Sequence, residues 1–320
     1  MNVLKPETRV RIIAALTEGC SIRATERLTD VHRDTIMRLG IRVGQGCERL
    51  HDSMFRNLNV SLVELDELWS YIGAKQAHRK PEHPGYFGDC YTWTALDAVN
   101  KAILAYRVGD RSRRDCAEFV WDLRTRLLNQ VQITSDGYAP YPNAIRASFG
   151  YDVDFATIEK IFASNAPESE KAQHRYSPGR VIGTEKEVVF GNPDPEKIST
   201  SHVERQNLTI RMQVRRFTRL TNGFSKRIAN HAAAFALFVG HYNLCRVHET
   251  IRCTPAVALR VTDHIWSIGE LVDAALSAPV ASPIIPPPLM PSPRPPKAAP
   301  APAPRGTGKV QLRVVRGGKA

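Results

Sequence analysis

The sequence VSLVELDELWSYIG, residues 60–73, is rich in apolar and β-branched residues and predicts a strand that is buried on at least one face. Two further runs of this kind, residues 91–99 and 103–108, follow it and are separated by the turn-like pair Asn100-Lys101. The chain therefore begins its sheet with one strand and then a β-hairpin.

The next 100 residues alternate helix and strand signals. Ser112 can cap a helix that runs to Leu128, and residues 131–134 form a short buried strand, which gives the order β-β-β-α-β. A helix over 141–149 and a last strand over 153–161 follow. Residues 162–200 are rich in Pro, Gly, Glu and Lys and predict an irregular insertion, after which residues 201–219 and 224–244 predict helices that cover the sheet. The fold class is α/β, with a mixed sheet flanked by helices.

The first 40 residues predict three short helices. Apolar residues recur at helical spacing before Gly19, Ser21 can cap a second helix, and a break at 29–31 precedes a third helix from His32 to Leu39. Two short helices joined by a tight turn form a helix-turn-helix, whose last helix enters the major groove of DNA. The groove-facing candidates are His32, Arg33, Thr35 and Arg38. A plain three-helix subdomain fits the pattern equally well.

The positive charge of the chain is concentrated in two segments. The formal net charge is +12, yet residues 205–248 hold eight Lys or Arg and residues 278–320 hold seven, both without any Asp or Glu, so the remainder carries −3. Such segregation favours a polyanionic partner over a merely solvated basic face, which is the alternative. The second segment includes 12 of the 22 prolines within 278–304 and predicts a disordered tail.

Cellular location and redox state follow from what the sequence lacks. No apolar run approaches the roughly 20 residues that span a bilayer, and the first residues have no apolar signal core. The six cysteines include no Cys-x-x-Cys pair, which is typical of reduced thiols rather than of a disulfide framework or a zinc ribbon. We expect a cytoplasmic protein without a membrane partner, associated with the nucleoid when it binds DNA.

Three carboxylates lie at positions that suggest a functional role. Asp66 lies inside the first predicted strand, Asp136 directly follows the strand 131–134, and Glu204 opens a helix that continues with basic residues. Those basic residues are Arg205, Arg211, Arg215 and Arg216. If the two strands are neighbours, as a right-handed crossover allows, their acids approach within reach of one ion. Oxygen ligands of this kind suit Mg²⁺, although the three acids are equally compatible with unrelated surface positions.

Three motifs resemble those of the DDE transposases, most closely the insertion sequence 1 family. They are Glu64-Leu65-Asp66-Glu67-Leu68-Trp69, Thr134-Ser135-Asp136-Gly137 and His202-Val203-Glu204-Arg205-Gln206-Asn207. A later stretch, His241-Tyr242-Asn243 with Arg246, His248 and Thr254-Pro255, looks like the end of integrase-like catalytic domains. The resemblance covers nearly all of residues 1–275.

The resemblance implies a ribonuclease H-like fold, a Mg²⁺ or Mn²⁺ cofactor, and Asp66, Asp136 and Glu204 as catalytic metal ligands. It also implies that Arg205 and Asn207 support the acids or contact DNA. Two departures stand out: the Cys-rich ribbon that often precedes the helix-turn-helix is missing, and 68 residues separate Asp136 from Glu204, which is consistent with an insertion.

Together these features predict three domains and one activity. Residues 1–58 form a DNA-binding helix-turn-helix region with a linker, 59–276 the catalytic domain with an insertion at about 162–200, and 277–320 a tail. The expected activity is metal-dependent cleavage of transposon ends in double-stranded DNA and transfer of the 3′ hydroxyl into target DNA, by a homo-oligomer on DNA. The alternatives are a non-catalytic DNA-binding regulator and a ribonuclease H-like nuclease that does not join strands.

Other constellations are weaker. His241, Cys245 and His248 have the spacing of a metal-binding helix face, and His241 with Asn243 resembles part of an HNH nuclease site. Asp97 is either an additional metal ligand or a strand-end acid, and the second is favoured. Tyr138 and Tyr141 are more typical of packing or DNA stacking than of a tyrosine recombinase.

Overall fold

The computed structural model describes residues 4–162, 181–219 and 222–279. The chain divides into residues 1–288 and residues 289–320, and all described residues belong to the first unit. The predicted tail from Val280 onward and the part of the predicted insertion at 163–180 lie outside the described residues. In the described part of the chain, every helix is too short or too polar to cross a membrane.

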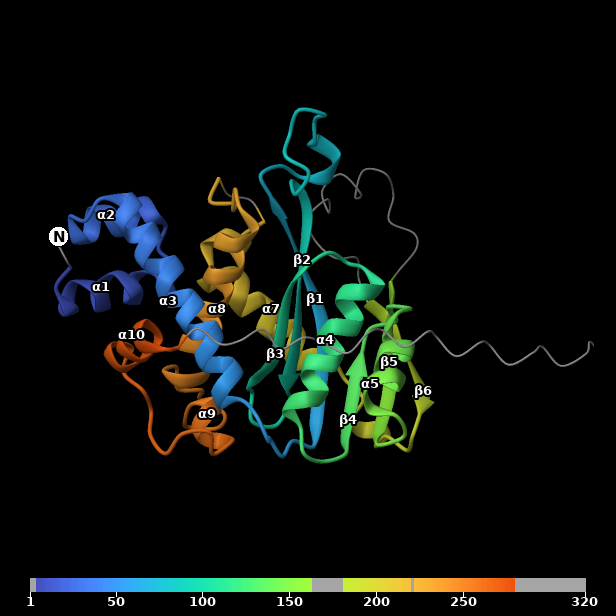
Figure 1. Cartoon of the computed structure of the whole chain (residues 1–320). Helices are drawn as coiled ribbons and strands as arrows, with labels where there is room; N and C mark the ends of the chain where they lie inside the picture. The colour runs from blue at the N-terminus through green and yellow to red at the C-terminus, as the bar shows by residue number, and fades with distance from the viewer. Residues whose placement is uncertain (1–3, 163–180, 220–221, 280–320) are drawn as a thin grey trace, which may run out of the picture. The chain divides into compact units, whose positions relative to one another are not determined.

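A six-stranded mixed sheet forms the centre of the first unit (Figure 1). Its strands, in spatial order, are β3 (Ile103–Gly109), β2 (Gly88–Asp97), β1 (Leu62–Ile72), β4 (Val131–Ser135), β5 (Val153–Phe162) and β6 (Val181–Phe190). β1, β4 and β5 are parallel to one another, whereas β2, β3 and β6 pair antiparallel with their neighbours. This arrangement is that of the predicted ribonuclease H-like class.

The sequence did not indicate β6, because residues 162–200 were expected to be irregular. The strand pairs with β5 alone and forms the edge of the sheet, and residues 184–188 are all exposed. A strand that is solvated on both faces needs no apolar alternation, and charged residues suit an edge because they oppose further strand pairing. Hydrophobic periodicity in the sequence therefore does not reveal this strand.

Helices cover both faces of the sheet (Figure 1). On one face, α4 (Arg113–Arg126) and α5 (Tyr141–Phe149) pack against apolar side chains of β1 such as Val63 and Leu65. On the other face, α7 (Ser201–Gln213) and α8 (Ile228–Leu244) enclose a second core that includes Leu68. Strand alternation thus sends even-numbered residues of β1 towards α7 and odd-numbered ones towards α4 and α5.

The N-terminal region consists of α1 (Pro6–Thr17), α2 (Ile22–Thr29) and α3 (Arg33–Met54). Ser21 caps α2 as predicted, because its side chain accepts a hydrogen bond from the Ala24 amide at 3.1 Å. The third helix does not end near Leu39, as the sequence indicated, but continues for 15 more residues. Gly44 and Gly46 lie in this extension and leave room for neighbouring backbone, since α3 lies close against α8 and α10 (Ile268–Ser277).

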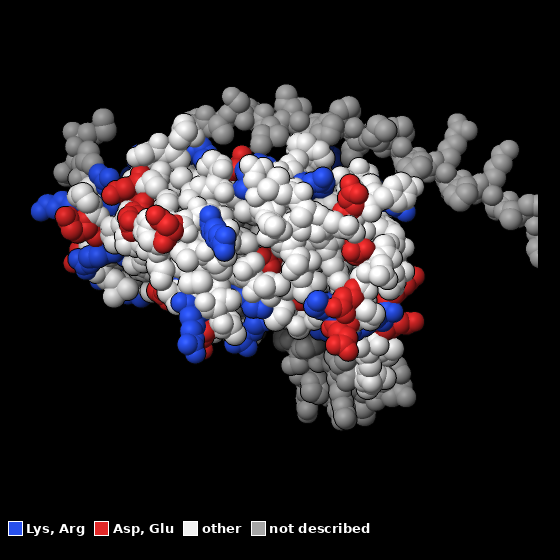
Figure 2. Space-filling model, turned by 90° about the horizontal axis from the view of Figure 1, so that it is seen from below, with Lys and Arg blue, Asp and Glu red and all other residues white. Residues whose placement is uncertain are grey.

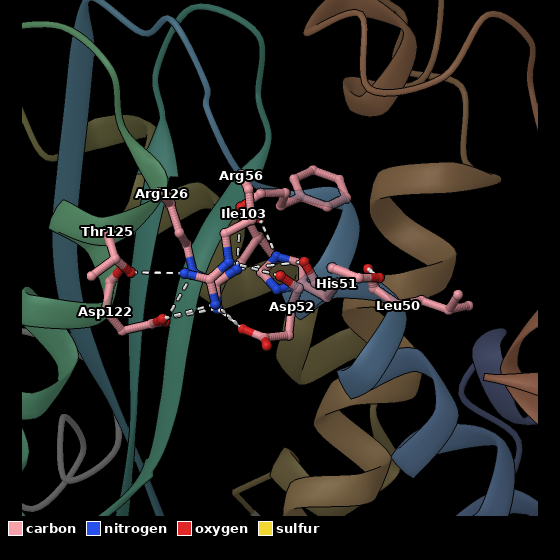
Figure 3. A network of polar contacts seen from close by, with 10 residues as sticks. Leu50, His51, Asp52, Arg56, Ile103, Asp122, Thr125 and Arg126 are labelled. Atoms are coloured by element: carbon pink, nitrogen blue, oxygen red, sulfur yellow. Dashed lines mark hydrogen bonds and ion pairs between the residues drawn. The ribbon is translucent and has the colours of Figure 1, made fainter. Parts of the chain in front are cut away.

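An ion-pair network joins the end of α3 to α4 (Figure 3). The Arg126 guanidinium contacts Asp52 and Asp122, each at 3.0 Å, and Arg56 binds Asp52 and the Thr125 hydroxyl. Beside it, the buried His51 places Nε2 3.0 Å from the carbonyl oxygen of Ile103 in β3. The N-terminal helices are therefore fixed to the sheet through paired charges as well as apolar packing.

Substitution of Gly44 tests the close packing of α3. A Cβ atom at position 44 would lie 2.0 Å from the Ala233 carbonyl oxygen of α8, so the helices must separate. We expect Gly44→Ala to lower the free energy of unfolding by about 2 kcal/mol, even though alanine favours helix by about 1 kcal/mol. Urea unfolding measures this, with Gly85→Ala as the control because nothing lies within 4 Å of a Cβ there. Equal stabilities of the two variants would contradict the packing.

Buried histidines make stability depend on pH. Burial lowers the pKa of His51 to about 3, below its ordinary value of 6.5, so the unfolded chain binds the proton more readily than the folded one. This contribution to stability is present above about pH 6.5 and is lost, at about 1.4 kcal/mol per pH unit, as the pH falls towards 3. Between about pH 7 and pH 5, we expect the free energy of unfolding to decrease less in His51→Asn than in the wild type. The exposed His78→Asn serves as the control, and a loss as large in His51→Asn as in the control would contradict the assignment.

Candidate active site

Two of the predicted acids lie level with each other on neighbouring parallel strands. Glu64 of β1 is the register partner of Thr134 of β4, and Asp66 and Asp136 each follow two residues later. Asp66 is in the middle of β1, whereas Asp136 directly follows the last residue of β4. The predicted proximity of these two strands is therefore observed.

Helix α7 places the third acid beside them. The fully buried Glu64 accepts a hydrogen bond from the Val203 amide at 2.8 Å, and Asn207 Nδ2 donates to Asp66 Oδ2 at 2.5 Å. These two contacts align α7 with β1. Glu204 lies between Val203 and Asn207, one turn before Asn207, and is therefore held near Asp66.

The pKa of Asp66 is affected by the other two acids. Its pKa is raised to about 6, first by burial and then by the negative charges of Asp136 and Glu204. Glu64 on the same side of β1 also has a raised pKa, about 7, because it is buried. Neighbouring carboxylates with raised pKa values favour a nearby cation, because a positive charge stabilises their ionised forms.

Each acid has its own partner in this structure. Lys160 of β5 pairs with Glu204, which also accepts from the Thr200 hydroxyl at 2.8 Å. Arg111 lies 3.7 Å from Asp136, and Asn207 binds Asp66. In the part of the chain that the structure describes, no three His, Cys, Asp or Glu side chains stand close enough together to hold a metal ion. The acids are neighbours, but they are not arranged as a finished ligand set.

Glu67 is a further acid of this region that sequence reasoning did not single out. Its side chain is only 2% exposed, points to the opposite face of β1 from Asp66, and accepts hydrogen bonds from Tyr141 and from Arg111 Nε at 3.1 Å. Burial raises its pKa to about 7. The signal was present in the sequence, because two consecutive acids in a buried strand must enter both cores.

Comparison with known proteins finds a distant relative of this chain. No family model matches the chain. This chain is 24% identical over 178 residues to the insertion element iso-IS1n protein InsB of Shigella dysenteriae. The alignment covers 56% of this chain and 93% of that protein. The predicted resemblance to the insertion sequence 1 family is confirmed.

The chain also has distant likenesses among solved structures of transposases. A Mos1 transposase paired-end complex with the left transposon end is 14% identical, with a TM-score of 0.20 over 47% of this chain and 57% of that one. A piggyBac transposase synaptic complex with hairpin DNA is 10% identical, with a TM-score of 0.33 over 86% and 71%. Scores of this size establish no shared fold.

The predicted DNA-contacting residues of α3 lie at its beginning. Arg33 and Arg38 are exposed, Thr35 is partly buried, and Arg38 Nη2 lies 3.4 Å from the Thr35 hydroxyl. These side chains are separate from the buried face of α3, which includes Ile36 and Leu39. Two helices and a three-residue turn are therefore present as predicted.

The arginines of the α7 region differ from one another. Arg205 and Arg215 are exposed, but Arg211 donates to the carbonyl oxygens of Phe217 at 3.1 Å and Trp69 at 3.4 Å, and Arg216 donates to the Ser225 hydroxyl. Burial lowers the pKa of Arg211 to about 10. Sequence spacing treats the four alike because it cannot distinguish an arginine that binds carbonyls from one in solvent. On the face drawn in Figure 2, basic and acidic side chains are interspersed, so this face has no continuous basic patch.

The weaker constellations have structural roles. His241 is buried near the end of α8, and the Asp97 carboxylate accepts from the amides of Val99 and Asn100, as expected of a strand-end acid. Tyr141 is fully buried and donates to Glu67, and Tyr138 stacks against Arg111, whose guanidinium carbon is 4.3 Å from the ring centre.

We expect Arg211→Gln and Arg215→Gln to affect different properties. Loss of the buried Arg211 contacts leaves carbonyl oxygens without donors and should lower the free energy of unfolding by about 1–3 kcal/mol. Loss of the exposed Arg215 should leave stability within about 0.5 kcal/mol and reduce the slope of log affinity for DNA against log salt by about 0.9. Urea unfolding and fluorescence anisotropy at several salt concentrations measure the two effects. The opposite pattern would show that Arg211, not Arg215, faces DNA.

Proposed function

We propose that this chain is a DNA transposase that hydrolyses the ends of its own element and joins the freed 3′ hydroxyl to target DNA. What supports the proposal is that Asp136 and Glu204, from motifs distant in sequence, are near enough to Asp66 for their charges to raise its pKa in addition to burial. The relationship to the insertion element protein supports the transposase assignment. The cleavage and joining chemistry is inferred from the acids.

We propose Mg²⁺ or Mn²⁺ as the cofactor, held by these three carboxylates. The donor set is all oxygen, which suits hard cations. Burial, and then the charges of Asp136 and Glu204, raise the pKa of Asp66, and a bound divalent ion would offset both effects. Lys160 must then release Glu204, because the two are paired in this structure. Such ions, when bound, activate an attacking water or hydroxyl and stabilise the leaving oxygen of a phosphodiester.

The chain's own residues would position the acids and the DNA. Glu64 and Asn207 fix α7 on β1, Arg111 holds the Asp136 loop, and the exposed Arg205 and Arg215 are available to backbone phosphates. Arg33, Thr35 and Arg38 of α3 would read the element end. We further propose that the chain acts as a homo-oligomer, since two element ends must be processed together.

Conservative replacement of the acids tests the proposal. Asp66→Asn, Asp136→Asn and Glu204→Gln retain shape but remove charge, so each should abolish cleavage and joining of a labelled element-end duplex while binding persists. The assay contains Mg²⁺, Mn²⁺ or no metal and separates bound, nicked and joined DNA. Glu159→Gln, an acid of β5 that points to Gly137, is the control and should retain activity.

Each contrary result of this assay would indicate a different function for the chain. Near-normal strand transfer by one variant would remove that acid from the site. Nicking by the wild type without joined product would indicate a nuclease, and tight binding without metal-dependent cleavage would indicate a DNA-binding regulator.

A further inference from the structure

Four basic side chains from three parts of the chain gather beside the first turn of α7. Lys101 is in the turn between β2 and β3, His202 is the second residue of α7, and Arg246 and His248 follow α8. None of them belongs to the acid cluster described above. They are called the basic cluster below.

Direct contacts join three members of the basic cluster, Lys101, His202 and His248. Lys101 Nζ lies 3.3 and 3.4 Å from the two ring nitrogens of His202. The Tyr242 hydroxyl donates to the Lys101 carbonyl oxygen at 2.9 Å, and the Tyr242 ring packs edge-on against His248 with 4.7 Å between ring centres. Tyr242 therefore connects the β2–β3 turn to the segment after α8.

Two polar groups of the basic cluster are buried without a partner. Among the described residues, neither Arg246 Nη1 nor His248 Nε2 has a hydrogen-bond partner, although both atoms are shielded from solvent. A buried polar group that makes no hydrogen bond costs about 1–3 kcal/mol, so such groups call for an explanation. An acceptor that reaches both groups would satisfy them.

The cluster also repels itself. Burial, and then the positive charges of Arg246 and Lys101, lower the pKa of His248. The acids that face Lys101 are Glu64 and Asp97, but Glu64 caps α7 and Asp97 binds the turn amides. Among the described residues, Glu64 Oε1 also lacks a hydrogen-bond partner, but neither acid bonds Arg246 Nη1 or His248 Nε2, and an anion would satisfy these two donors.

We propose that Lys101, His202, Arg246 and His248 form a binding site for a backbone phosphate of a DNA strand. This inference rests on the proposed function and deepens it. An arginine guanidinium matches the geometry of phosphate oxygens, and the exposed His202 leaves the site open to a long ligand. His202 and Glu204 are two residues apart in α7 and face different sides of the helix, so the phosphate bound here is a different one from the phosphate that reacts.

Salt-dependent DNA binding tests the site. The probe is a labelled DNA duplex without divalent metal, titrated at several salt concentrations with the full chain. Removing one phosphate contact lowers the slope of log affinity against log salt by about 0.9, so Arg246→Gln should lose that amount and bind several-fold more weakly. Arg246→Lys keeps the charge and should restore the slope. Arg79→Gln, an exposed arginine outside the cluster, is the matched control.

The outcomes distinguish this inference from the proposed function. A slope in Arg246→Gln equal to that of the wild type overturns the phosphate site, even when the wild type cleaves and joins DNA. A reduced slope in Arg246→Gln with a wild type that fails to cleave supports the site and counts against the transposase chemistry. If Arg246→Gln does not unfold cooperatively, Lys101→Gln takes its place with the same expected loss and the same contradicting result.

Discussion

Helix α7 is fixed along β1 by two acids of that strand, and the candidate active site depends on this attachment. Glu64 accepts from an amide in the first turn of α7, where the helix carries partial positive charge, and Asp66 accepts from Asn207 one turn later. An acid with no exposed surface, such as Glu64, is tolerable only with a partner of this kind. The same arrangement places Glu204 beside Asp66, so the buried capping acid positions the exposed one.

Each carboxylate of the candidate site is matched by a neighbour of different chemistry. Asp66 accepts a hydrogen bond from the side-chain amide of Asn207. Asp136 pairs with the guanidinium of Arg111, and Glu204 pairs with the ammonium group of Lys160. Arg111 also forms an ion pair with Glu67 on the opposite face of β1. The two faces of the strand are thus linked through one arginine, while burial first, and then the charges of Asp136 and Glu204, raise the pKa of Asp66.

Sequence patterns predicted the parts of the fold that are buried on one face. β1 to β5, α4, α5 and the Ser21 cap all have apolar periodicity or a capping side chain, and they appear where expected. The edge strand β6 and the second half of α3 were missed, because one is solvated on both faces and the other contains glycines that serve helix contact. The acids were found through their motifs. The inward direction of Arg211 and the partner of Glu67 required coordinates, since they depend on tertiary contacts.

The central claim is that Asp66, Asp136 and Glu204 together bind divalent cations. Titration calorimetry of Mn²⁺ into the full-length protein, without DNA and with DNA bound, tests it most directly. We expect binding by the wild type that is lost or strongly weakened in Asp66→Asn, Asp136→Asn and Glu204→Gln alike, with Glu159→Gln unaffected. Mn²⁺ binding of unchanged stoichiometry and affinity in the three variants would contradict the account.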